Sequence, residues 1–330
     1  MNVFAAACLL VGQTEDRGRM DVVFCIDRSG SMQGVIAAAK QKVWAIVNEM
    51  ARAKPSPILR IGLLGYGTSD RALEFFPLTD DLDKVYESLM TFKVDMGGEE
   101  WVGWAAKKAA DRMEWSRDPK ALKVIFMIGN ETAAQGPAEV LYTRTVPEII
   151  KKDIVVNAVY CGVPSPEEER TWRELARLAD GTYTQIELSG GAISIETPMD
   201  KKLVELNQKL NGTYLAFGRH GADGKARQEL QDANSAASGG AGNLALRAAA
   251  KSKDVYDARG WDLVDAAKDK NFKLDELKEA ELPAEMRAMT PEQRKAHVEK
   301  VRQEREALQK EIHEVDTQRT QHLQEEIKKR

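Results

Sequence analysis

The sequence is poor in cysteine, in net positive charge and in long apolar runs, and each shortage excludes a class of protein. Three cysteines in 330 residues cannot form the disulfide framework of a small secreted scaffold. A net charge of −4 gives no electrostatic footprint for nucleic acid. No internal run approaches the roughly 20 apolar residues that span a bilayer. We therefore expect a soluble mature protein of about two domains, with a hydrophobic core.

Signatures of common catalytic sites are also missing. No Gly-x-Ser-x-Gly elbow, P-loop or Gly-x-Gly-x-x-Gly follows an expected strand. None of the four histidines forms an i,i+4 metal pair, so we expect them on the surface. Any chemistry must come from carboxylates, hydroxyls and amides.

The N-terminal segment, residues 1–19, has two readings. Residues 3–11 are apolar and resemble the core of a secretory signal, but the segment is short and lacks a positive n-region. A truncated export signal would place the mature protein in the periplasm or outside the cell. A frayed extra strand or helix would leave the protein in the cytoplasm.

Residues 20–190 alternate between strand and helix patterns. Such alternation predicts an α/β domain, a doubly wound and mostly parallel sheet with helices on both faces. The expected strands lie at residues 22–26, 58–66, 73–76, 122–128, 154–160 and 183–186. The expected helices lie at residues 33–53, 82–92, 101–115, 139–152 and 166–179.

Beyond residue 190 the pattern becomes helical, which predicts an α-helical C-terminal extension. Residues 191–217 contain a capped amphipathic helix, and residues 218–243, rich in Gly, Ala, Ser and Asn, predict a flexible linker. Residues 244–330 form a helical region that ends in a long charged helix. Arg305 and Arg319 interrupt the apolar heptad of that helix. It either rests on the rest of the chain or forms a coiled coil that binds a partner or a second copy.

The most informative motif follows the first expected strand. Asp27, Ser29 and Ser31 stand at alternate positions directly after residues 22–26, and Gly30 permits a tight turn. Ligands of open α/β sheets bind beyond the carboxyl ends of the strands. Three oxygen side chains at this place suit a hard cation such as Mg²⁺, Mn²⁺ or Ca²⁺.

Asp27, Ser29 and Ser31 match the Asp-x-Ser-x-Ser signature of the von Willebrand factor type A (vWA) domain, which residues 20–190 resemble. The wider chain also resembles an uncharacterised group of bacterial exported proteins with this domain, through residues 39–44, 78–82, 129–131 and 261–265. The resemblance implies a six-stranded, Rossmann-like sheet of order 3-2-1-4-5-6 with an antiparallel third strand. In that order the strand at residues 122–128 lies between the strands that carry Cys25 and Cys161, so these two cysteines are too far apart to form a disulfide.

The resemblance also implies a metal-ion-dependent adhesion site. Ser29 and Ser31 would ligate the ion through Oγ, and Asp27 would hold it directly or through water. The family completes this site with a threonine and an aspartate from later loops. Here Glu99, with Asp95 and Glu100 nearby, stands for the threonine, and Asn130 stands for the aspartate. These exchanges either conserve the charge around the metal, or Glu99 blocks the open coordination position, or the site no longer holds metal.

Three functions remain open. The first is a non-catalytic protein-binding module, in which an ion held by Asp27, Ser29, Ser31, Glu99 and Asn130 engages a carboxylate of a partner protein. The second is a metal-free structural scaffold. The third is a Mg²⁺-dependent phosphohydrolase with Asp27 as nucleophile. Such enzymes generally have a second carboxylate two residues after the nucleophile, where this chain has Ser29.

Overall fold

The computed structural model describes residues 18–51, 56–67, 73–94, 98–187 and 196–329. The chain divides into two compact units, unit 1 (Met1–Ile193) and unit 2 (Ser194–Arg330). Most of the N-terminal segment for which we weighed an export signal, residues 1–17, lies outside the described residues. No described helix combines the length and the apolarity that a membrane crossing requires.

The described part of unit 1 contains one six-stranded sheet of order β3-β2-β1-β4-β5-β6. All neighbouring strands are parallel except β2 and β3. The predicted sheet order and the antiparallel third strand are therefore confirmed. The strands are β1 (Arg19–Asp27), β2 (Ile58–Tyr66), β3 (Glu74–Thr79), β4 (Leu122–Gly129), β5 (Ile154–Cys161) and β6 (Tyr183–Ile186).

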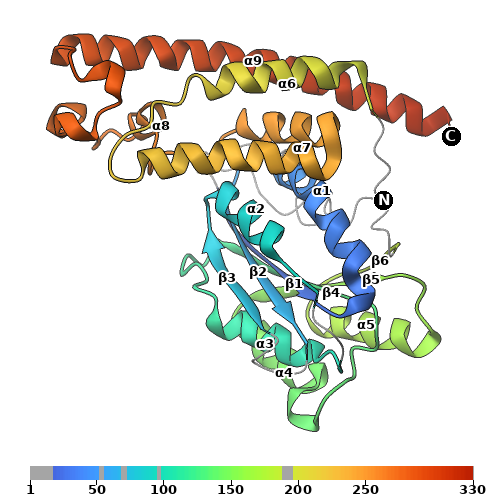
Figure 1. Cartoon of the computed structure of the whole chain (residues 1–330). Helices are drawn as coiled ribbons and strands as arrows, with labels where there is room; N and C mark the ends of the chain where they lie inside the picture. The colour runs from blue at the N-terminus through green and yellow to red at the C-terminus, as the bar shows by residue number, and fades with distance from the viewer. Residues whose placement is uncertain (1–17, 52–55, 68–72, 95–97, 188–195, 330) are drawn as a thin grey trace. The chain divides into compact units, whose positions relative to one another are not determined.

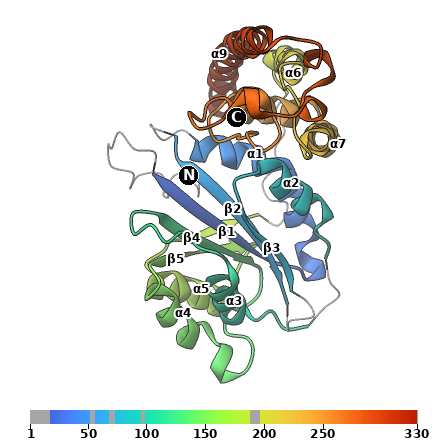
Figure 2. The ribbon, with the colours of Figure 1, turned by 90° about the vertical axis from the view of Figure 1, so that its left-hand side faces the viewer.

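Helices cover both faces of this sheet, as Figures 1 and 2 show. The helices α1 (Gln33–Met50) and α2 (Leu82–Thr91) lie on one face. The helices α3 (Val102–Arg112), α4 (Tyr142–Ile150) and α5 (Pro166–Leu178) lie on the other. The central strand β1 is buried from Met20 to Asp27, which explains its continuous apolar run. Cys25 and Cys161 are buried free thiols.

Unit 2 is helical. Its main helices are α6 (Pro198–Asn211), α7 (Gly221–Lys251), the short α8 (Leu263–Ala266) and α9 (Pro291–Lys329). Helix α6 contacts both α7 and α9, and Figure 2 shows these helices side by side. The backbone leaves helical geometry at Gly239 and Gly240, so α7 consists of two helices joined at that point.

The prediction of a flexible linker over residues 218–243 is wrong, because most of it lies in α7. The buried face of this helix carries polar and small residues instead of an apolar stripe, so it has no hydrophobic period. Gln228 and Gln231 are buried there, and a Cβ on Gly224 would lie 2.3 Å from the Trp261 ring. The composition of residues 218–243, taken without the structure, is therefore that of a linker.

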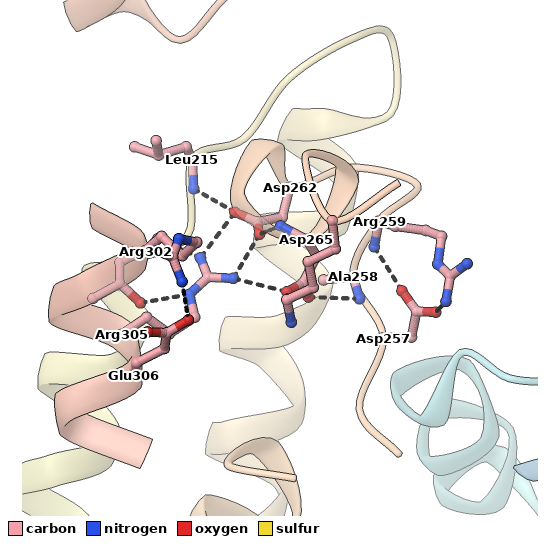
Figure 3. Close-up of polar contacts among 11 residues, drawn as sticks. Leu215, Asp257, Ala258, Arg259, Asp262, Asp265, Arg302, Arg305 and Glu306 are labelled. Carbon is pink, nitrogen blue, oxygen red and sulfur yellow. Dashed lines mark hydrogen bonds and ion pairs between the residues drawn. The ribbon is translucent and has the colours of Figure 1, made fainter. Parts of the chain in front are cut away.

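Helix α9 packs against α6, α7 and α8, in keeping with the alternative that it rests on the rest of the chain. Four of its buried positions recur every seven residues, namely Val298, Arg305, Ile312 and Arg319, and Val301 is buried between the first two. Arg305 Nη1 lies 2.7 Å from Asp262 Oδ2, and Arg319 Nε lies 2.6 Å from Asp200 Oδ1 (Figure 3 shows the Arg305 cluster). These positions pack inside the unit and do not present a coiled-coil seam to a second copy.

Candidate metal centre

The loop after β1 brings Asp27, Ser29 and Ser31 together at the carboxyl edge of the sheet. The Ser29 amide donates to Asp27 Oδ1 over 2.7 Å, and Ser29 Oγ donates to Asp27 Oδ2 over 3.0 Å. Ser29 Oγ and Ser31 Oγ are 2.8 Å apart. Gly30 begins a 3-10 turn that leads into α1, which keeps the loop this short.

Asn130 completes the cluster from the neighbouring strand. It follows β4 directly, and β4 pairs with β1, so both loops start at the same edge. Ser31 Oγ donates to Asn130 Oδ1 over 3.2 Å. The structure therefore brings together Asp27, Ser29, Ser31 and Asn130, four of the five residues predicted for the site.

The spacing of these oxygens fits a divalent cation. Successive oxygens are 3.0, 2.8 and 3.2 Å apart. The ligands of an octahedral Mg²⁺, each at about 2.1 Å from the ion, lie about 3 Å from one another. Hydrogen bonds between hydroxyls have the same length. An ion can thus replace these hydrogen bonds without a large movement of the oxygens.

Asp27 is buried and lies near a second carboxylate, that of Glu131. Its side chain is 1% exposed, and burial raises its pKa to about 6 although Ser29 donates two hydrogen bonds to it. The negative charge of Glu131 contributes to the same rise. A bound cation would stabilise the ionised form of this carboxylate.

Glu100, one residue beyond the predicted Glu99, lies beside this cluster. Glu99 is exposed and its Oε2 accepts a hydrogen bond from Trp101 Nε1 over 2.9 Å. Glu100 is 4% exposed and interacts electrostatically with Asp27. The structure therefore favours Glu100 over Glu99 as the acidic member from this loop. Asp95, the other acid considered there, lies outside the described residues.

Glu131 and Gln135 extend the polar cluster beyond Asn130. Gln135 Nε2 donates to Glu131 Oε2 over 2.7 Å and to Glu100 Oε2 over 3.3 Å. Burial, the charge of Asp27 and a hydrogen bond with Glu131 raise the pKa of Glu100 to about 8. The sequence pattern gave no role to Gln135, because it lies in an irregular loop without a period.

The cluster differs from a preformed site made of acidic side chains alone. Among the described residues, no three or more His, Cys, Asp or Glu side chains are grouped so that they could hold a metal. A cation here would depend on the two serine hydroxyls and the Asn130 amide oxygen as well as on carboxylates. Such a donor set is composed of oxygen and suits a hard cation.

Comparison with protein families gives one match in this part of the chain. Residues 22–132 match the family model described as the von Willebrand factor type A domain. The matched range includes β1 from Val22 onward, the Asp27 loop, β4 and Asn130. Among curated proteins, none matches the chain significantly.

Solved structures with a similar fold are distant. The conserved hypothetical protein BatB from Bacteroides thetaiotaomicron is 15% identical, with 51% of this chain and 90% of that chain covered and a TM-score of 0.41. The SpRpn10 VWA domain is 16% identical; the alignment covers 53% of this chain and 100% of that domain, with a TM-score of 0.41. Proximal thread matrix protein 1 from the mussel byssus was solved with a zinc-occupied MIDAS motif. It is 15% identical, and the alignment covers 51% of this chain and 42% of that chain, with a TM-score of 0.41. Similarity at this level is too low to transfer a ligand or a partner.

Proposed function

Because this chain carries a von Willebrand factor type A domain, matched over residues 22–132, we propose that it is a non-catalytic protein-binding module with a cation at the Asp27 loop. The observation that carries the proposal is the row of four oxygens from Asp27, Ser29, Ser31 and Asn130 at successive distances of 3.0, 2.8 and 3.2 Å. These oxygens come from two adjacent parallel strands, at the edge where such sheets bind ligands.

Each side chain has a distinct role in this proposal. Ser29 and Ser31 hold Mg²⁺, Mn²⁺ or Ca²⁺ through Oγ, and Asp27 holds it directly or through water. Asn130 supports the ion with its amide oxygen, and Glu100 takes the role that we first gave to Glu99. The cation attracts a carboxylate of the partner protein, in a charge-assisted contact that strengthens as water is excluded.

A metal-free scaffold is the second candidate, and one observation favours it. The serine hydroxyls lie within hydrogen-bond distance of Asp27, of each other and of Asn130. Their two protons can serve two of these three contacts at a time, so the cluster is largely held together without an ion. A phosphohydrolase has no comparable support, because Ser29 occupies the acid/base position and its hydroxyl donates to Asp27.

Thermal melting separates the first two candidates. The protein is melted in EDTA and again with Mg²⁺, Mn²⁺ or Ca²⁺ in excess. At about 100 times the dissociation constant, a bound ion adds about 2.7 kcal/mol to the free energy of unfolding. The double variant Ser29→Ala/Ser31→Ala should lose this gain. Ser88→Ala, which removes an exposed hydroxyl that donates to Lys84 within α2, should keep it. A wild type that melts identically in EDTA and in every metal would support the scaffold.

Partner binding needs its own test. Proteins retained by the immobilised chain should be released by EDTA and should not bind Ser29→Ala/Ser31→Ala. Retention that survives both changes would contradict a cation-bridged contact. Turnover of a phosphate ester that disappears in Asp27→Asn would instead support the enzyme.

A further inference from the structure

Three buried aromatic side chains hold the loop that carries Asn130. Tyr66 Oη donates to the carbonyl of Ile128 over 3.1 Å, and Tyr160 Oη donates to the carbonyl of Asn130 itself over 2.8 Å. Trp172 Nε1 donates to the carbonyl of Glu131 over 2.6 Å. The three donors come from β2, β5 and α5, so three separate elements fix this four-residue stretch of backbone.

The aromatic donors also pack closely on one another and on Gly129. All three side chains are 3% exposed or less, and the rings of Tyr160 and Trp172 meet edge to face at 6.0 Å. A Cβ on Gly129 would lie 2.8 Å from Tyr66 Oη and 3.0 Å from the Trp172 ring. Glycine is therefore required at residue 129 by the aromatic groups that cover it.

This packing gives a physical reason for one departure from the vWA pattern. A Thr-Asp pair is expected after the central strand, and this chain has Gly129-Asn130. A threonine at residue 129 would collide with Tyr66 and Trp172. The exchange of threonine for glycine thus accompanies a different way of fixing the loop, by hydrogen bonds from aromatic side chains to its carbonyls.

We propose that Tyr66, Tyr160 and Trp172 are positioning residues of the cation site, an inference that rests on the proposed function. They do not touch the ion. They fix the backbone of residues 128–131, so that Asn130 Oδ1 stays 3.2 Å from Ser31 Oγ and the Glu131 carboxylate stays at the same edge. Groups that orient metal ligands commonly change metal affinity by about 10- to 100-fold when they are removed.

Two substitutions remove the donors and keep an aromatic ring at each position. Tyr160→Phe removes the hydrogen bond to the Asn130 carbonyl, and Trp172→Phe removes the bond to the Glu131 carbonyl. Each should lower the affinity for Mn²⁺, measured by calorimetric titration of the metal-stripped full chain, by about 10-fold or more. At saturating Mn²⁺ their electron paramagnetic resonance spectra should differ from that of the wild type, since the ligands are less well oriented.

The chain offers matched controls for both variants. Tyr86 Oη donates to the Lys40 carbonyl over 3.1 Å, and Trp115 Nε1 donates to the Ala109 carbonyl over 3.1 Å. Tyr86→Phe and Trp115→Phe lose equivalent bonds on parts of unit 1 that do not carry the site. They should lower stability in EDTA by a similar amount and leave the Mn²⁺ affinity within about 2-fold of the wild type.

A further variant restores the residue of the vWA pattern at residue 129. Gly129→Thr introduces the residue that the vWA pattern would lead one to expect, but it should weaken Mn²⁺ binding because the new side chain displaces Tyr66 and Trp172. If Gly129→Thr does not fold, as its circular dichroism in EDTA would show, the two phenylalanine variants still decide the question.

The outcomes distinguish this inference from the proposed function. Wild-type binding with unchanged affinity in Tyr160→Phe and Trp172→Phe would overturn the positioning role and leave the cation site standing. Equal losses in the test and control variants would show that the bonds only stabilise the fold. If the wild type binds no Mn²⁺, Mg²⁺ or Ca²⁺, both proposals fail together.

Discussion

Replacement of Arg305 by leucine should destabilise unit 2 more than any exposed charge substitution on α9. The Arg305 side chain is 2% exposed, and Nη1 lies 2.7 Å from Asp262 Oδ2 and 3.2 Å from Asp265 Oδ1 (Figure 3). Nε donates to Thr213 Oγ1 over 3.1 Å, and the guanidinium lies 4.1 Å from the centre of the Tyr214 ring. One side chain thus joins α9 to the segments on either side of α7.

The cost follows from the carboxylate that remains. Asp262 is fully buried, and without Arg305 it keeps the backbone donors of Leu215 at 2.6 Å and Asp265 at 2.9 Å. Burial already raises the pKa of Asp262, while Arg305 opposes the rise. Removing one partner of a buried ion pair costs about 3–5 kcal/mol, because a charge is left without compensation.

Arg302→Leu is the matched control, one turn earlier on the same helix. Arg302 is 39% exposed and pairs with Glu299 and Glu306 at the surface. Such pairs contribute about 0–1 kcal/mol. Native-state hydrogen exchange of α6 and α9 peptides in graded denaturant measures the opening free energy of unit 2 separately from unit 1.

The result that refutes the reasoning is equal stability of the two variants. A second check uses Asp262→Asn/Arg305→Leu, which removes the buried charge on both sides. Its loss should be smaller than the sum of the single losses, since the uncompensated carboxylate is gone. Additive losses would show that the ion pair is not the source of the effect.

Three further predictions concern other parts of the chain. Gly224→Ala should destabilise unit 2 by about 1–3 kcal/mol because its Cβ meets the Trp261 ring. The control Gly260→Ala has no atom within 4 Å of the new Cβ, so its stability should differ from that of the wild type by no more than about 0.5 kcal/mol in the same hydrogen-exchange experiment. In EDTA the stability of unit 1 should fall as the pH rises from about 5 to about 8, because folded Glu100 retains a proton that the unfolded chain releases near pH 4.5. Glu100→Gln should flatten this part of the melting curve against pH, and an unchanged slope would contradict the assignment. The charges of Lys251 and Arg247 outweigh burial and lower the pKa of Asp232, so unit 2 should lose stability as the pH falls below about 4, and Asp232→Asn should lack this acid sensitivity.

The fold of unit 1 could be predicted because its local signals agree with its packing. Strands buried on both faces appear as continuous apolar runs, and the starts of α2 and α5 carry side-chain caps. At the start of α5 the Ser165 hydroxyl accepts from the Glu168 amide while the Glu168 carboxylate accepts from the Ser165 amide, which is the capping box typical of a Ser-x-x-Glu sequence.

The errors in unit 2 have a common physical cause. Its helices bury polar side chains, some of which pair with residues distant in the sequence, as Arg305 does with Asp262 and Arg319 with Asp200. A periodicity of apolar residues does not detect such positions. Arg305 and Arg319 looked like breaks in a heptad, and they are instead among its buried positions. The small residues of α7 looked like a linker, and Gly224 instead admits the Trp261 ring.

The candidate site was predictable only where a motif fixes the spacing. Asp27, Ser29 and Ser31 follow from the alternate positions of one loop, and Asn130 follows from the end of the adjacent strand. The choice between Glu99 and Glu100 depends on which side chain the loop turns inward, and a loop without a period gives no signal for this. The donors to the Asn130 loop are likewise ordinary core residues in sequence.

The central claim is that a divalent cation binds between Ser29 and Ser31 at the end of β1. Anomalous X-ray scattering from a crystal of the protein grown with Mn²⁺ tests this directly. We expect one manganese peak within ligand distance of both serine Oγ atoms, beside Asp27, and no peak there in Ser29→Ala/Ser31→Ala. A manganese-saturated crystal with no peak at the two serines would contradict it.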